Sequence, residues 1–227
     1  MIFVRGRTSC TVSRTSDISG VAYGLFASIE SRNGARPKVT NLDIQANQVV
    51  AGDVSMVGAL AGYVKDAILL SIDITFADNA RVNGLNFVGG LAGMAFGNIT
   101  VKNITITNPT ITAEVYQTDN AYMTVSGLRE FRSELKNNLN SNTNNSSSLL
   151  SRLQKYSYAG SVIGFVDGYI VDNREFSYNQ SPNYAINNVR ATGVVKVQGQ
   201  IVGGLFGLAG YQTNISDAGL QVTGSSS

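Results

Sequence analysis

Residues able to do chemistry are sparse in this sequence. The chain contains no histidine and one cysteine, Cys10. Without histidine, Ser-His-Asp and Cys-His catalysis, imidazole general bases and histidine metal sites are excluded. One cysteine allows neither an internal disulfide nor a thiolate metal cluster. The chemistry that remains is that of carboxylates with arginine or lysine, and we predict no metal site and no cofactor.

Carboxylates paired on one face of a repeated fold could cleave polysaccharides, because most glycosidases act through two carboxylates. Asp43 and Asp73 follow similar motifs, but we expect them one residue out of register with each other, and Thr105 stands at that point of the next unit. The other aspartates are scattered. The spacing therefore predicts no catalytic residues, and a protein that is not an enzyme.

Tyrosine is concentrated between residues 156 and 184, a stretch that holds half of the ten tyrosines. Tyrosine on a rigid loop supplies contact area and a hydroxyl at low entropy cost, as sugar- and protein-binding surfaces use it. The alternative is that these rings only cover a flank of the fold. We predict ligand contacts for Tyr156, Tyr158, Tyr169, Tyr178 and Tyr184.

A second candidate surface lies in residues 116–158. Leu128, Phe131 and Leu135 recur at helical spacing there, and a polar Asn/Ser-rich tract follows at 137–148. We predict a helical insertion that packs on a flank of the fold. The alternative is a recognition surface, for which Arg129 and Arg132 are the predicted ligand-binding residues.

Two short motifs recur along the chain and decide the fold class. The first is "VGGLAG" at 88–93 and "VGGLFG" at 202–207, with "AYGLFA", "VGALAG" and "AGSVIG" as variants at 22–27, 57–62 and 159–164. The second follows each, as in "VKNITI" from Val101, and contains Asn41, Ser71, Asn103, Asn188 or Asp217. The basic period is about 30 residues, which is typical of solenoids and propellers.

Each unit reads as three short strands. Ile99 and Val101 alternate with polar residues, and Ile104 and Ile106 alternate in the opposite phase, as at a corner between strands. Glycine in the first motif would permit positive φ and close backbone approach. We predict an inward apolar ladder of Leu25, Leu60, Leu91, Val162 and Leu205, and a polar ladder at a corner of Asn41, Ser71, Asn103, Asn188 and Asp217.

These patterns predict an all-β chain that forms a right-handed parallel β-helix of about five coils with a helical insertion. The handedness follows from the general bias of parallel crossovers. Residues 1–115 and 159–227 form the coils of one continuous domain, interrupted by 116–158. A leucine-rich repeat is the alternative, because "VTNLDIQAN" from Val39 fits that template.

The paired motifs resemble the GLUG-motif repeats of bacterial surface and secreted proteins over most of residues 21–224. The resemblance is strongest at "VGGLAG" and "VGGLFG". It implies an extracellular or cell-surface β-solenoid that acts as a noncatalytic adhesin-like region and presents loops to a host or cell-surface glycan or protein. A carbohydrate-active β-helix enzyme and an accessory region of a secreted peptidase, such as an immunoglobulin A peptidase, are the alternatives.

Charge and hydropathy narrow the range of partners. The net charge of +2 is too small to indicate a nucleic-acid partner, and the longest apolar runs are too short to insert in a membrane. The start "MIFVRGRTSC" lacks the apolar region of a signal peptide, so we expect a protein that stays inside or a piece of a longer one. An uncovered last coil would favour end-to-end self-association.

Overall fold

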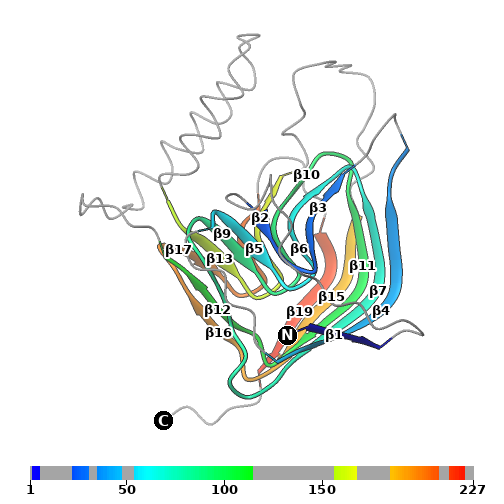
Figure 1. Ribbon diagram of the computed structural model, residues 1–227. Coiled ribbons are helices and arrows are strands. Elements are labelled where there is room, and N and C mark those ends of the chain that lie inside the picture. Colours follow the sequence, from blue (N-terminus) through cyan, green and yellow to red (C-terminus); the bar gives the residue numbers. More distant parts are fainter. Residues whose placement is uncertain are drawn as a thin grey trace, which may run out of the picture.

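The computed structural model describes residues 2–5, 22–30, 35–47, 54–114, 156–167, 185–209 and 215–222. In these ranges the chain forms strands and no helix. Strands that are far apart in the sequence lie side by side in chain order, as the colours of β4, β7, β11, β15 and β19 show (Figure 1). The predicted helical insertion, residues 116–158, lies almost wholly outside the described residues.

The strands form four sheets, which we name A to D. Sheet A contains, in order, β1 (Ile2–Arg5), β4 (Lys38–Ala46), β7 (Ile68–Phe76), β11 (Thr100–Thr107), β15 (Ala185–Gly193) and β19 (Ile215–Val222). Sheet B contains β2 (Ala22–Tyr23), β5 (Met56–Gly58), β9 (Phe87–Gly89), β13 (Tyr158–Gly160) and β17 (Ile201–Gly203). Sheet C contains β3 (Phe26–Glu30), β6 (Ala61–Lys65), β10 (Ala92–Phe96), β14 (Ile163–Asp167) and β18 (Phe206–Ala209). Sheet D contains β8 (Val82–Gly84), β12 (Thr110–Ala113) and β16 (Lys196–Gln198).

Each turn of the chain passes through sheets B, C, A and D in that order, as β9, β10, β11 and β12 do. Every pairing between coils is parallel, so the parallel β-helix of about five coils is confirmed. The second, third and fourth coils have four strands where the sequence predicted three, because the glycine motif forms two short strands of its own. The antiparallel pairing of β1 with β4 is the exception to the parallel order.

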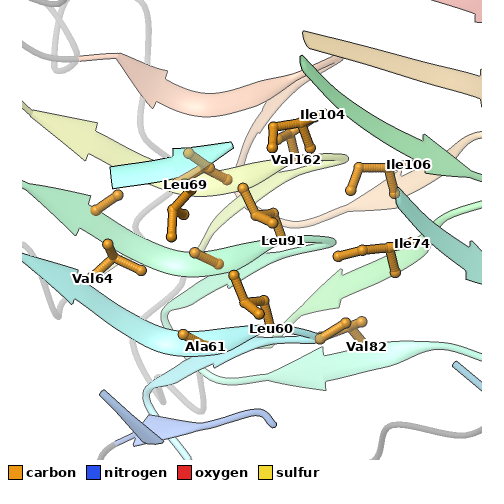
Figure 2. Close-up of a cluster of buried hydrophobic side chains, with 14 of the residues drawn as sticks. Leu60, Ala61, Val64, Leu69, Ile74, Val82, Leu91, Ile104, Ile106 and Val162 are labelled. Atoms are coloured by element: carbon orange, nitrogen blue, oxygen red, sulfur yellow. The ribbon is translucent and has the colours of Figure 1, made fainter. Parts of the chain in front are cut away.

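The predicted apolar ladder forms the centre of the main core. Leu60, Leu91 and Val162 are fully buried and stack from coil to coil (Figure 2). Leu25 is nearly as buried. Leu205, in the last coil, is partly buried against the same cluster. The ladder is therefore confirmed, and the hydrophobic effect supplies its stability.

A second apolar cluster fills the space between sheets B and C and has no counterpart in the sequence analysis. Its members are the first residues of the B strands and the third residues of the C strands, with Phe96 added: Ala22, Met56, Phe87, Met94, Phe96, Tyr158 and Phe165. The Phe87 and Tyr158 rings stack with centroids 5.1 Å apart, and Phe165 meets both edge-on at 5.8 and 5.7 Å. These are favourable aromatic geometries.

Close approach of backbones explains the motif glycines. A Cβ on Gly93 would lie 2.5 Å from both the Phe87 oxygen and the Val57 nitrogen. A Cβ on Gly89 would lie 2.7 Å from the Ile163 Cα and would also collide with the Ala92 oxygen. The second expected reason, positive φ, was wrong for this motif: among the described glycines only Gly97 and Gly193 have positive φ.

The polar ladder occupies the middle of the sheet A strands. Its five residues all have left-handed φ between 48 and 55°, a conformation that Asn and Asp tolerate best. Strand β11 continues through this residue, and both of its halves pair with the same neighbours, β7 and β15. At the left-handed residue, the alternation of inward and outward side chains changes phase. Val101, Ile104 and Ile106 therefore all point inward and are buried.

Candidate functional site

The outward side of sheet A carries rows of polar side chains that run across the coils, and we call it the polar face. The mid-strand row is the polar ladder itself, with Asn41, Asn103 and Asp217 exposed. The next row is Asp43, Asp73, Thr105 and Arg190, which pair strand to strand in one register. The third row is Gln45, Thr75, Thr107, Thr192 and Gln221.

Parallel pairing sets the spacing of the polar face. Neighbouring strands lie about 4.8 Å apart and alternate residues about 6.6 Å apart along a strand, so the rows form a regular grid. The grid presents amides, hydroxyls, carboxylates and a guanidinium, which together offer donors and acceptors in every row. Such a surface suits a ligand that is itself extended and rich in hydroxyl groups.

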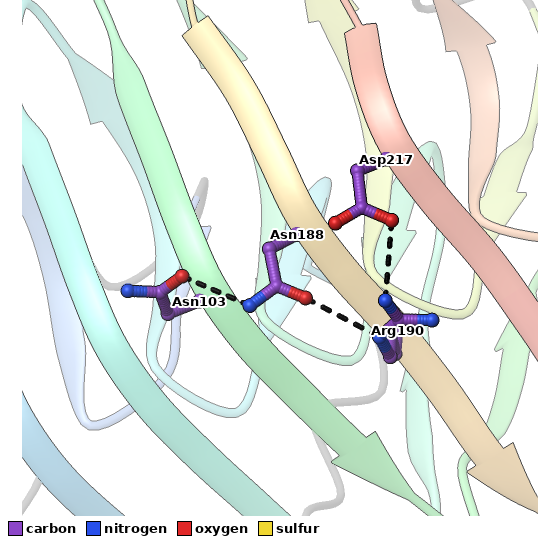
Figure 3. Close-up of polar contacts among 4 residues, drawn as sticks. All are labelled: Asn103, Asn188, Arg190 and Asp217. Atoms are coloured by element: carbon purple, nitrogen blue, oxygen red, sulfur yellow. Dashed lines mark hydrogen bonds and ion pairs between the residues drawn. The ribbon is translucent and has the colours of Figure 1, made fainter.

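Side chains of the polar face hold one another in place (Figure 3). Asn188 Nδ2 donates to Asn103 Oδ1 at 2.9 Å, across 85 residues of sequence. Arg190 donates to Asn188 Oδ1 at 3.2 Å and to Asp217 Oδ1 at 3.1 Å. In the third row, the Thr107 and Thr192 hydroxyls lie 3.2 Å apart. These contacts orient the polar groups before any ligand binds.

The expected register of Asp43 and Asp73 was wrong. The two residues are direct partners in the pairing of β4 with β7, and both are exposed. Each lies two residues beyond the left-handed residue of its own strand, so they share one position of the repeat.

The tyrosines predicted to bind a ligand are not brought together by the described structure. The sequence predicts Tyr158 on an exposed surface, but the residue is fully buried in the second apolar cluster. Tyr156 is half-buried and packs against the same cluster, and its carbonyl accepts a 3.1 Å hydrogen bond from Asn86. Tyr169, Tyr178 and Tyr184 lie outside the described residues, as do Arg129 and Arg132.

The Tyr158 side chain is buried deeply enough to change the pKa of its hydroxyl. Burial raises the pKa of its hydroxyl well above the ordinary value, and the nearby Tyr156 adds to the rise. The hydroxyl oxygen has no hydrogen-bond partner within the described part of the chain. A buried hydroxyl without a partner lowers stability. Tyr158 therefore acts as a packing residue.

Replacing Tyr158 by phenylalanine tests this role. We expect Tyr158→Phe to raise the free energy of unfolding by about 1 kcal/mol, because it removes an unpaired buried hydroxyl and keeps the ring contacts. The raised pKa favours the neutral hydroxyl in the folded state, so wild-type stability should fall as the pH rises above about 10, the ordinary tyrosine value, and the variant should fall less. Urea unfolding followed by circular dichroism at pH 7 and pH 11 measures the stability of both proteins and its loss at high pH. Lower stability of the variant at pH 7 would show that the hydroxyl is paired.

Other kinds of site are not formed by the described residues. Among them, no group of three His, Cys, Asp or Glu side chains is placed to hold a metal ion. The described residues also form no helix that is long and apolar enough to cross a membrane.

Sequence reasoning missed the polar face as a site. Thr105, Thr107, Arg190 and Thr192 would have emerged from aligning each unit on its left-handed residue.

The chain was compared with protein families, curated proteins and solved structures. Neither family models, curated proteins nor solved structures gave a match to the chain. The resemblance to GLUG-motif repeats therefore stays a prediction from the motifs.

Proposed function

We propose that this chain is a noncatalytic β-solenoid region of a bacterial cell-surface or secreted protein, and that its polar face binds a glycan. One observation carries the proposal: the outward side chains of sheet A form in-register rows of hydrogen-bonding groups. The resemblance to GLUG-motif repeats supports the cellular setting. A protein partner bound by the tyrosine-rich residues 168–184 stays the alternative within the same class.

The polar face fits a glycan better than an acidic or basic polymer. Among the sheet A side chains that the structure describes, the charges balance, with Lys38, Lys102 and Arg190 against Asp43, Asp73 and Asp217. A nucleic acid would require an excess of positive charge to neutralise phosphates. Neutral sugars instead require many directional donors and acceptors, which the three rows supply.

A glycan array with the purified chain tests the proposal. The face variant Asp73→Ala/Arg190→Ala removes two groups from one row, on either side of Thr105. The matched control Lys196→Ala/Gln198→Ala removes two exposed polar side chains from sheet D. We expect saturable binding by the wild type and the control, and binding at least about tenfold weaker in the face variant, because each lost charged hydrogen bond contributes about 1.5–3 kcal/mol.

Two results would count against the polar face. Binding that is lost only in Tyr169→Ala/Tyr178→Ala/Tyr184→Ala would place the site at residues 168–184 and keep the adhesin function. Absence of binding in every version of the chain would contradict glycan recognition altogether.

A carbohydrate-active enzyme is the second candidate, and the register of Asp43 and Asp73 favours it. Adjacent strands place these residues about 4.8 Å apart, near the separation of about 5–5.5 Å between the carboxyl groups of retaining glycosidases. Incubating a glycan that binds on the array with the chain, and measuring new reducing ends, tests this candidate. Turnover that disappears in Asp73→Asn would establish catalysis, and an unchanged polymer would leave binding as the function.

A further inference from the structure

The third row of the polar face is chemically the most uniform. In each coil it has an uncharged side chain that both donates and accepts hydrogen bonds: Gln45, Thr75, Thr107, Thr192 and Gln221. The register does not shift from one pair of strands to the next, because Thr107 pairs with both Thr75 and Thr192. A ligand that lies across the strands therefore meets the same kind of group at each step of about 4.8 Å.

Along a single strand, the polar groups neither repeat nor keep an even spacing. In β11 they are Lys102, Asn103, Thr105 and Thr107, so the first interval is one residue and the next two are two residues. The uneven interval falls at the left-handed residue Asn103, where the alternation of side chains changes phase. A polymer of identical units could therefore repeat its contacts across the strands but not along one strand.

The second row limits the charge of the ligand. Asp43 and Asp73 are exposed and lie side by side on neighbouring strands, and Arg190 lies two strands beyond Asp73. A polymer with a negative charge on every unit would be repelled at the aspartates, and one with a positive charge on every unit would be repelled at Arg190. Hydroxyl groups of a neutral polymer can instead form charge-assisted hydrogen bonds with all three residues.

We propose that the polar face binds an unbranched, neutral, β-linked polysaccharide that lies across the strands with one sugar per coil. This inference rests on the proposed glycan function and adds the class and the direction of the glycan. An extended β-linked pyranose chain advances per sugar by roughly the 4.8 Å between neighbouring strands. The second and third rows lie about 6.6 Å apart, a separation that the hydroxyl groups on the two edges of one ring can bridge.

Two variants that each change one coil test the direction of the ligand. The first, Asp73→Ala/Thr75→Val, removes the second-row and third-row groups of β7. The second, Arg190→Ala/Thr192→Val, removes those of β15, and β11 lies between the two strands. Calorimetry measures binding of three linear, neutral hexasaccharides: cellohexaose, mannohexaose and xylohexaose.

We expect at least one of these hexasaccharides to bind the wild type. Each variant should raise its dissociation constant about tenfold or more, because each removes two hydrogen bonds. The two losses should multiply in the combined variant, since the changed groups lie about 9.6 Å apart and do not contact each other. The control Lys196→Ala/Gln198→Ala, on sheet D, should bind as the wild type does.

A hexasaccharide of galacturonic acid tests the class of the ligand, because it carries a negative charge on every sugar. We expect it to bind at least about tenfold more weakly than the neutral hexasaccharide. Equal binding of the two would overturn the neutral class.

The other outcomes separate this inference from the function on which it rests. Weaker binding in only one of the two coil variants would show that the glycan lies along a strand. A glycan bound on the array, with none of the three hexasaccharides bound, would overturn the class and leave glycan recognition in place. Unchanged binding in both coil variants, or an array without any bound glycan, would contradict the proposed function of the polar face itself. Thermal unfolding shows whether each variant folds, and Thr192→Val alone replaces the β15 variant if that variant unfolds.

Discussion

Gly89→Ala is expected to lower the free energy of unfolding by about 3 kcal/mol or more, and the melting temperature by roughly 10 °C. The new Cβ would meet the Ile163 Cα and the Val162 oxygen, both at 2.7 Å, and the Ala92 oxygen. All three are backbone atoms, two of them in the next coil, so no side-chain rotation relieves the contact. The coils would have to separate around the third and fourth repeats.

A matched control separates this effect from the general cost of replacing glycine. Gly219 is also in a strand, its φ is not positive, and a Cβ placed on it meets nothing within 4 Å. We expect Gly219→Ala to be neutral or slightly stabilising, since it lowers the entropy of the unfolded chain. Thermal unfolding by circular dichroism compares the two. Equal stability of Gly89→Ala and Gly219→Ala would contradict the close approach of the two strands.

The repeat made much of the fold predictable. Each coil meets the same environment as its neighbours, so a position needed for packing recurs at a fixed spacing. Leu60, Leu91 and Val162 stack as the motif indicated, and the left-handed φ of Asn103 and Asn188 follows from their residue type and place.

Features outside the repeat could not be predicted. The strand β1 has no equivalent in other coils, and its antiparallel pairing depends on tertiary contacts. The second apolar cluster arises because sheets B and C fold against each other, which periodicity alone does not indicate. For that reason the sequence predicts Tyr158 at the surface, although its ring packs on Phe87.

The candidate site was harder to predict than the fold. A tyrosine-rich stretch is a compositional signal, and only Tyr156 and Tyr158 of its five members lie in the described residues. The polar face depends instead on register, which brings Asp73, Thr105 and Arg190 into one row from strands separated by long stretches of chain. Residue types show that these side chains are polar, whereas only the pairing shows that they are neighbours.

Successive repeats stack in one register across residues 116–158, because β11 and β15 pair directly. Asn103 and Asn188 stand on either side of it and hydrogen-bond to each other. In a Cys10→Ser background, we expect Asn103→Cys/Asn188→Cys to form a disulfide on oxidation, because neighbouring strands lie about 4.8 Å apart, within the reach of the bond. Closing a loop of 85 residues should raise the stability of the oxidised over the reduced protein by about 4 kcal/mol.

The control pair is Asn41→Cys/Asn103→Cys in the same background. These two residues have β7 between their strands, which places them about 9.6 Å apart and beyond the reach of a disulfide. The decisive measurement is the amount of intramolecular disulfide in each pair, by mass spectrometry after mild oxidation. The account predicts a near-complete bond in the 103/188 pair and little in the 41/103 pair. A 103/188 pair that stays reduced in a folded protein would contradict the stacking.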